Sequence, residues 1–117
     1  MGHLSTHVLD TMHGSPAAGM RVTLSRLDPA PLELRAFTLD ADGRFDGGAL
    51  LDEKAMAAGR YRLVFGVADY FRSRGVALPE PPFIDEVTLD FGIADAAGHY
   101  HVPLLVSPWA YSTYRGS

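Results

Sequence analysis

The sequence predicts an all-β fold, an antiparallel β-sandwich formed by a single domain over residues 1–117. Three observations lead to this expectation. Apolar residues recur with a period of two, turn sequences interrupt them often, and only one short segment is typical of a helix. Seven or eight short strands of this kind are characteristic of a sandwich. A chain of 117 residues fits one domain and leaves little room for a second.

The first half of the chain contains three expected strands. Residues 4–9 and 21–25 alternate apolar and polar side chains, which indicates strands with one buried face. Residues 34–39 show the same alternation more weakly. Turn signals separate and follow these runs; they are His13-Gly14-Ser15-Pro16, Asp28-Pro29-Ala30-Pro31, Asp42-Gly43 and Gly47-Gly48.

The second half is expected to hold the helix and the remaining strands. Residues 68–74 have helical character and stop at Gly75, a residue that often follows a helix C-terminus. Residues 54–58 are expected to form a helical turn at most. The expected strands are residues 61–65, 86–91, 99–106 and a short last one at 111–115.

Composition excludes several classes of protein. The net charge is -4 and the basic residues are scattered, whereas a nucleic-acid surface needs clustered positive charge. No apolar run approaches the ~20 residues of a membrane helix. The first residues do not resemble a signal peptide, so a cytoplasmic location is expected. The absence of cysteine excludes disulfides, thiolate nucleophiles and cysteine-based zinc sites.

Two of the expected strands carry mixed second faces. In residues 99–106, one face is apolar, and the other holds His99, His101, Pro103 and Leu105. In the first strand, His7 shares a face with Ser5 and Leu9. Open water does not suit the leucines, and a dry core does not suit the imidazoles. These faces therefore indicate a subunit interface that encloses a wet, partly apolar pocket.

The histidines allow two interpretations. His99 and His101 have a spacing found in metal sites, but without cysteine or a clear third ligand no metal site is predicted. His7 and His101 lie in the middle of strands, and an imidazole is the side chain best suited to act as a base near neutral pH. By itself, Arg44 after the turn at Asp42-Gly43 is an ordinary hairpin arginine.

The C-terminal residues are unusual for a chain end. Tyr114-Arg115-Gly116-Ser117 combines an aromatic ring, a cation, a glycine and a hydroxyl after a strand-like run. We expect the terminal carboxylate to lie beside Arg115, where a small polar molecule could be held. Each of these residues also has an ordinary interpretation as part of a frayed tail.

Taken together, these segments closely resemble the 5-hydroxyisourate hydrolases, the transthyretin-related family of urate breakdown. The resemblance covers essentially the whole chain, and the terminal tetrapeptide is its most specific part, since it separates the hydrolases from transthyretin, the hormone carrier of the same fold. The residues that carry it are Leu4-Ser5-Thr6-His7-Val8-Leu9-Asp10, Gly14-Ser15-Pro16-Ala17, Asp42-Gly43-Arg44, Gly59-Arg60-Tyr61, His99-Tyr100-His101-Val102-Pro103-Leu104-Leu105-Val106-Ser107-Pro108 and Tyr111-Ser112-Thr113-Tyr114-Arg115-Gly116-Ser117.

The resemblance implies a transthyretin-like sandwich of two four-stranded sheets with one short helix, assembled as a homotetramer with ligand sites in a channel between dimers. It also implies that 5-hydroxyisourate is hydrolysed to 2-oxo-4-hydroxy-4-carboxy-5-ureidoimidazoline without a cofactor. The implied catalytic residues are His7, Arg44, His101 and Ser117, and the implied substrate-binding residues are Leu105, Tyr114, Arg115 and Gly116.

The chemistry explains why such residues are needed. A neutral imidazole takes a proton from water, and Arg44 or Arg115 stabilises the oxyanion and holds the urate-like oxygens. Which histidine is the base stays open. Two alternatives are a non-catalytic small-molecule carrier of the transthyretin kind and a sandwich module that binds through an exposed edge.

Overall fold

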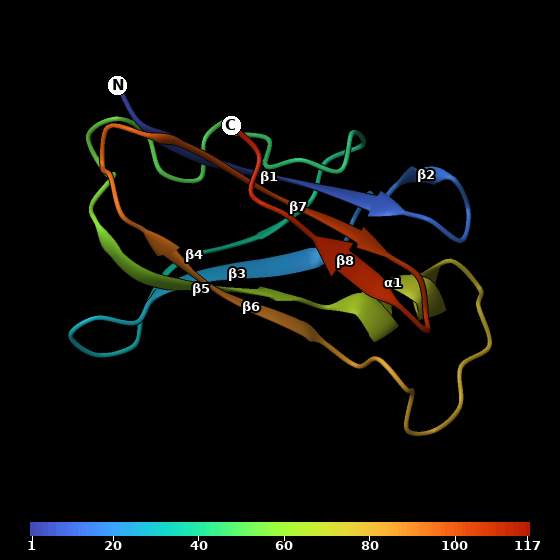
Figure 1. Cartoon of the computed structure of the whole chain (residues 1–117). Coiled ribbons are helices and arrows are strands. Elements are labelled where there is room, and N and C mark those ends of the chain that lie inside the picture. The colour runs from blue at the N-terminus through green and yellow to red at the C-terminus, as the bar shows by residue number, and fades with distance from the viewer.

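A computed structural model describes residues 1–117 as eight strands and one helix (Figure 1). In chain order the elements are β1 (His3–Asp10), β2 (Ser15–Pro16), β3 (Arg21–Arg26), β4 (Leu32–Thr38), β5 (Gly59–Phe65), α1 (Val67–Ser73), β6 (Val87–Ile93), β7 (His99–Val106) and β8 (Tyr111–Thr113). The expected sandwich, its strands and its one helix are confirmed. The one helix, α1, has 7 residues and is far too short to span a bilayer.

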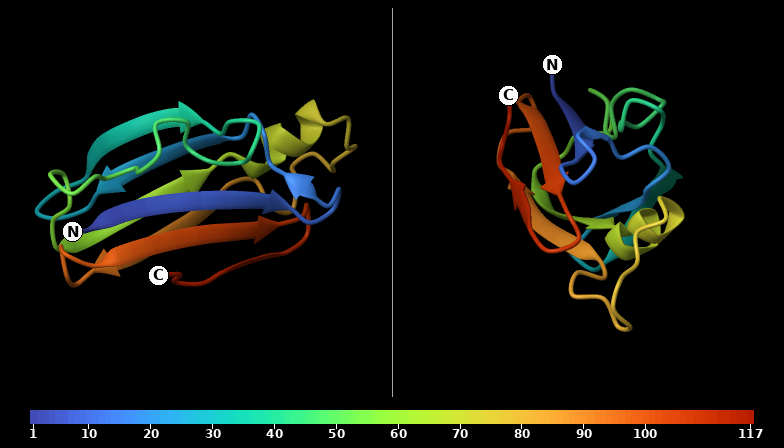
Figure 2. Two further views of the ribbon diagram at one scale, coloured as in Figure 1. Left: turned by 90° about the horizontal axis from the view of Figure 1, so that it is seen from above. Right: turned by 90° about the vertical axis from the view of Figure 1, so that its right-hand side faces the viewer.

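The strands form two four-stranded sheets that lie one over the other (Figures 1 and 2). One sheet has the order β2-β1-β7-β8 and the other has the order β4-β3-β5-β6. The alternation read from the sequence places every second side chain between the sheets, where 23 buried residues form one core. In β1, for example, Leu4 and Val8 are fully buried, while His7 on the other face is only partly covered.

One pairing departs from the antiparallel pattern. β1 and β7 are parallel along their full length, with His3 opposite His99, Ser5 opposite His101 and Leu9 opposite Leu105. All other strand pairs are antiparallel. Parallel neighbours need a long connection, and here most of the chain lies between these two strands.

Two strand ends differ from expectation for identifiable reasons. The turn expected at residues 13–16 closes at Gly14, whose φ is 68°, and its last two residues pair with β1 as the edge strand β2. β8 ends at Thr113, although the same register resumes at His101↔Gly116. Pro103 interrupts the ladder because it has no N–H, and its carbonyl instead accepts the Thr113 hydroxyl at 2.6 Å.

A buried carboxylate holds α1 against the end of β1. The Asp10 side chain is fully buried and accepts hydrogen bonds from the His13 N–H at 2.9 Å and the Tyr70 hydroxyl at 2.7 Å. His13 Nδ1 lies 2.6 Å from Asp10 Oδ2, and Arg74 adds a weaker ion pair at 3.6 Å. Burial, the largest influence, raises the pKa of Asp10, but the hydrogen bonds and the charge of His13 together lower it below its ordinary value of 3.8.

Replacing Tyr70 by phenylalanine should reduce the free energy of unfolding by about 1.5–3 kcal/mol at neutral pH, the scale of a hydrogen bond to a charged group. Because the pKa of Asp10 is lowered, its ionised form stabilises the fold above pH 3.8, and this contribution is lost as the pH falls through the folded-state value. The destabilisation by Tyr70→Phe should therefore shrink in acid. Urea unfolding at neutral and acidic pH tests this.

Tyr111→Phe is a matched control, since the Tyr111 ring is 48% exposed and its hydroxyl makes no hydrogen bond within the chain. An equal loss of stability by Tyr70→Phe at both pH values would contradict the role assigned to the Asp10 carboxylate.

Candidate active site

The turn that carries Arg44 is fixed against β1. Gly43 has a φ of 75°, and a Cβ there would lie 2.5 Å from the carbonyl oxygen of Val8, so glycine is required on both counts. The Val8 N–H donates to the Gly43 carbonyl at 2.9 Å, and Arg44 then pairs with His7 as an isolated bridge. The sequence Asp42-Gly43-Arg44 therefore places Arg44 directly opposite His7.

The same turn selects the tautomer of His7. Its Nε2 lies 2.9 Å from the Asp42 carbonyl oxygen. A carbonyl can only accept, so Nε2 carries the hydrogen. The lone pair of the neutral His7 ring is consequently on Nδ1.

Arg44 is oriented from one side only. Its Nε donates to Asp42 Oδ2 at 2.9 Å, and both side chains are largely exposed, so this pair adds little stability. The two Nη groups make no hydrogen bond within the chain. They form a free planar fork that can bind carbonyl or carboxylate oxygens.

His101 lies between β1 and the C-terminal segment. Its Nδ1 is 2.8 Å from Ser5 Oγ, and its Nε2 has no partner within the chain. Burial is the main cause that lowers the pKa of His101 below its ordinary value of 6.5, followed by the positive charges of Arg44, His7 and His3. The ring is therefore neutral at neutral pH, which is the form that can accept a proton.

Gly116 makes room for this ring. It exchanges backbone hydrogen bonds with His101 at 2.7 and 3.2 Å. A Cβ at Gly116 would lie 3.1 Å from both Cβ and Cδ2 of His101, closer than most contacts of this kind. A larger residue there would require His101 or the C-terminal segment to shift by a few tenths of an ångström.

Arg115 lies on the other side of the sheet. Its guanidinium carbon is 4.3 Å from the centre of the Tyr100 ring, which faces the core, and its Nη2 donates to the His99 carbonyl at 2.9 Å. The predicted grouping of Arg115 with the imidazoles is thus not seen in the single chain. Ser117 is exposed and its hydroxyl makes no hydrogen bond.

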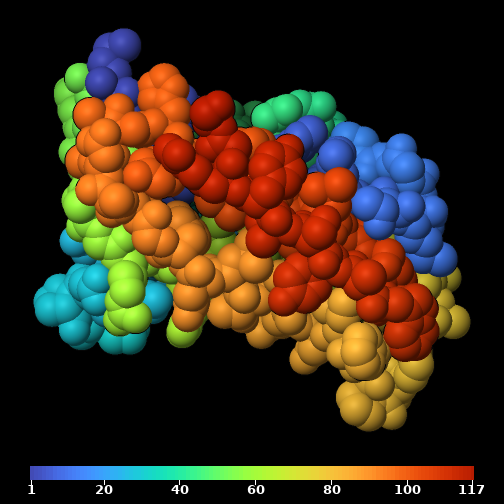
Figure 3. All heavy atoms as spheres, viewed as in Figure 1, coloured from blue at the N-terminus to red at the C-terminus, as the bar shows by residue number.

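A cleft of about 560 Å³ opens between the sheets where β6 and β8 form their edges. Tyr114 and Arg115 border it together with Tyr100, and the Tyr114 ring is 61% exposed. Figure 3 shows this side of the molecule, with the red C-terminal segment lying over its surface. The C-terminal segment therefore borders the cleft through Tyr114 and Arg115, and it contacts His101 through Gly116.

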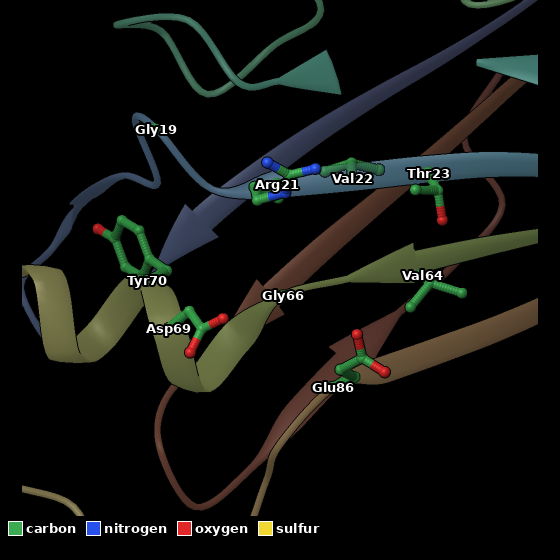
Figure 4. Close-up of a pocket in the computed structure, with 9 residues that line it drawn as sticks. All are labelled: Gly19, Arg21, Val22, Thr23, Val64, Gly66, Asp69, Tyr70 and Glu86. Carbon is green, nitrogen blue, oxygen red and sulfur yellow. The ribbon is translucent and has the colours of Figure 1, made fainter. Parts of the chain in front are cut away.

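A second hollow of about 370 Å³ lies between β3, β5 and the start of α1 (Figure 4). Arg21, Asp69 and Glu86 give it charges of both signs, and none of its lining residues is a histidine. It therefore lacks the imidazoles found on the β1–β7 face. Nowhere in the chain are three or more His, Asp or Glu side chains arranged to hold a metal ion.

The structure brings His7, Arg44, His101, Gly116 and Leu105 to one face of the first sheet. Sequence reasoning did not identify Ser5 and Asp42 as contacts of the imidazoles. Ser5 had been placed on the face of His7, but its partner on the neighbouring strand depends on a register that the sequence does not display. The Asp42 contact is made by a backbone carbonyl, which every residue has.

Arg44→Gln should raise the pKa of His101, because it removes a positive charge that disfavours the imidazolium. The value should stay below 6.5, since burial is the larger cause. Titration of the His101 ring by NMR measures the change. Arg60→Gln is the control, because Arg60 pairs with Asp28 and is not a cause of the His101 shift. An unchanged pKa in Arg44→Gln would contradict the proximity of the two groups.

Known proteins share this arrangement of the chain. The chain matches the HIUase/Transthyretin family over residues 4–116. It is 56% identical to the 5-hydroxyisourate hydrolase of Pseudomonas aeruginosa over 118 residues, covering 100% of this chain and 93% of that protein.

Two solved structures are similar to it. One is the 5-hydroxyisourate hydrolase of Klebsiella pneumoniae, with a TM-score of 0.81 and 34% identity, each chain being covered by 100%. The other is an (S)-allantoin synthase, with a TM-score of 0.95 and 46% identity; 99% of this chain matches 44% of that longer one. A family match over residues 4–116 and full-length relatives at this identity show that the chain belongs to the HIUase/transthyretin family.

Proposed function

We propose that this chain is a hydrolase that opens the ring of 5-hydroxyisourate to give 2-oxo-4-hydroxy-4-carboxy-5-ureidoimidazoline. The observation that carries the proposal is the grouping of two imidazoles and a free guanidinium fork on the β1–β7 face, in a chain that matches 5-hydroxyisourate hydrolases over its full length. The test is incubation with freshly made 5-hydroxyisourate, with its ultraviolet absorbance followed against the spontaneous decay.

In this mechanism His101 is the general base. Its pKa is lowered, so the ring is neutral, and Nε2 is free to take a proton from a water molecule. The water oxygen attacks the ring carbonyl, and the electron pair of the C=O bond moves onto oxygen. Arg44 provides donors for the resulting oxyanion through its free Nη groups.

The intermediate then collapses. The carbonyl re-forms, the ring C–N bond breaks, and the leaving nitrogen takes a proton from the His101 imidazolium, which returns to its neutral form. We assign His7 a different part, because the lowered pKa singles out His101 as the base. The Nε2–H of His7 donates to the Asp42 carbonyl. Its Nδ1 lone pair is available to accept a hydrogen bond from the substrate or the attacking water. The reaction needs no cofactor.

A carrier function would require none of this polarity. A site that only binds a small molecule does not require an imidazole that is held neutral beside a cation. We therefore favour the enzyme over a non-catalytic carrier of the transthyretin kind.

His101→Asn should leave the fold intact and lower kcat by at least ~100-fold, the usual scale for the loss of acid–base catalysis. In the unmodified protein, kcat should fall in acid with a midpoint below pH 6.5, because the lowered pKa of His101 delays its protonation. This acid limb should disappear in the variant. Steady-state rates as a function of pH, together with thermal melts, measure both effects.

His99→Asn is the matched control. His99 precedes His101 on the same face of β7, but it is exposed and its Nε2 bonds to the Met1 carbonyl. It should retain activity within a few-fold. Full activity in His101→Asn with an unchanged melt would exclude His101 as the base.

The working form is proposed to be a homotetramer in the cytoplasm. Leu9 and Leu105 lie opposite each other on the face of the imidazoles and are only partly covered in the single chain. Burying apolar surface at ~25 cal/mol per Å2 favours association over this face. Excluding water from such an interface also strengthens the electrostatic interactions around the substrate. The lack of cysteine is compatible with a reducing compartment.

Leu105→Glu should split the tetramer toward dimers, because a buried and unpaired charge is costly at an interface. Hydrolysis should fall along with the tetramer fraction, which sedimentation and rates on the same sample would measure. Leu32→Glu is the control, since Leu32 is 61% exposed and lies on β4 of the other sheet. A folded Leu105→Glu dimer with native turnover would mean that the site does not need four subunits.

A further inference from the structure

We propose that Ser5 is a positioning residue that holds His101 in one tautomer, with the hydrogen on Nδ1 and the lone pair on Nε2. The inference deepens the proposed function, because it rests on Nε2 of His101 being the atom that takes the proton from water. It adds to the site a residue that does not touch the substrate and acts only through the imidazole.

The contact is built into the centre of the first sheet. Ser5 and His101 are directly opposite on the parallel strands β1 and β7, and the Oγ–Nδ1 distance is 2.8 Å. On the inner face, the next residue Thr6 donates its hydroxyl to the Val102 carbonyl at 2.7 Å and ties the same two strands together. Ser5 Oγ makes no other hydrogen bond within the chain. Its position relative to the imidazole is therefore set by the core of the sheet.

The three sides of the His101 ring have different surroundings. Nδ1 faces Ser5 on the neighbouring strand β1, and Cδ2 faces Gly116 in the segment that follows β8. Nε2 has no protein partner and is left for water or substrate. If the ring flipped by 180°, Nδ1 would leave Ser5 and this hydrogen bond would be lost.

A hydroxyl can donate or accept, and the two choices have opposite consequences. If Ser5 donates to Nδ1, the neutral ring carries its hydrogen on Nε2 and cannot act as a base there. If Ser5 accepts from Nδ1–H, the lone pair is on Nε2. Only this second arrangement survives proton uptake unchanged, because both nitrogens of an imidazolium are donors. The Nδ1–H···Oγ bond then becomes charge-assisted and stronger as the positive charge forms.

The tautomers can be read directly from the imidazole ¹⁵N shifts of the full-length protein, at a pH where His101 is neutral. The unmodified protein should show a protonated Nδ1 and an unprotonated Nε2 for His101. In Ser5→Ala the population should shift toward the Nε2–H form, which imidazoles prefer in water. Ser5→Thr keeps a hydroxyl and suits a strand, so it should restore the original pattern.

Ser112→Ala is the matched control, because Ser112 lies opposite Leu105 on the adjacent β8 and its hydroxyl makes no contact with an imidazole. It should leave the His101 signals unchanged. A dominant Nε2–H tautomer in the unmodified protein, or the same populations with and without the Ser5 hydroxyl, would overturn the inference.

Kinetics supply the second measurement. Ser5→Ala should lower kcat on the order of 10-fold, the effect of one hydrogen bond, with little change in KM, and Ser5→Thr should recover most of it. An equal loss of kcat in Ser5→Ala and Ser5→Thr would mean that Ser5 acts through packing and not through its hydroxyl. If the unmodified protein hydrolysed no 5-hydroxyisourate, the proposed function would be wrong. The NMR experiment would still show which tautomer of His101 is present, so the two claims are tested separately.

Discussion

The site depends on one constraint, the parallel register of β1 and β7. These two strands occupy the middle of their sheet, and the register sets Ser5 against His101, residues 96 positions apart in the chain. Their inner faces are filled by core residues such as Val8 and Leu104, which are fully buried. A slip of one residue would move an entire face into the core or out of it. Packing of the core therefore enforces the placement of the imidazoles on the outer face.

The remaining parts of the site attach to the free edges of this strand pair. The turn before Arg44 hydrogen bonds to β1, and the C-terminal segment pairs with β7 through Gly116. Both attachments use a glycine. At Gly43 the Val8 carbonyl leaves no room for a Cβ, and at Gly116 a Cβ would make a tight contact with His101. The glycines in these two short motifs are thus explained by contact distances, and at Gly43 also by its positive φ.

Local patterns predicted much of the fold and part of the site. The period of two identified the long strands and separated their faces, and Gly75, with a φ of 80°, ended the helix as expected. The pattern could not give the parallel pairing, because strand partners far apart in the sequence leave no local signal. For the same reason, the Ser5 contact and the side of the sheet taken by Arg115 became visible only in the structure. The resemblance to a family supplied Arg44 and Gly116 as site residues, which periodicity alone would not single out.

The two histidines show how neighbours assign different roles to one side chain. His7 faces a carbonyl, which accepts only, so its Nε2–H is fixed and the ring cannot reorient its lone pair. His101 faces a hydroxyl, which can remain an acceptor whether the ring is neutral or charged. The Asp42 carbonyl likewise remains an acceptor in both states, so neither partner has to rearrange when the free nitrogen takes a proton. His101 is distinguished instead by its burial, which is the main cause that lowers its pKa and keeps the ring neutral near pH 7, and this favours His101 as the base.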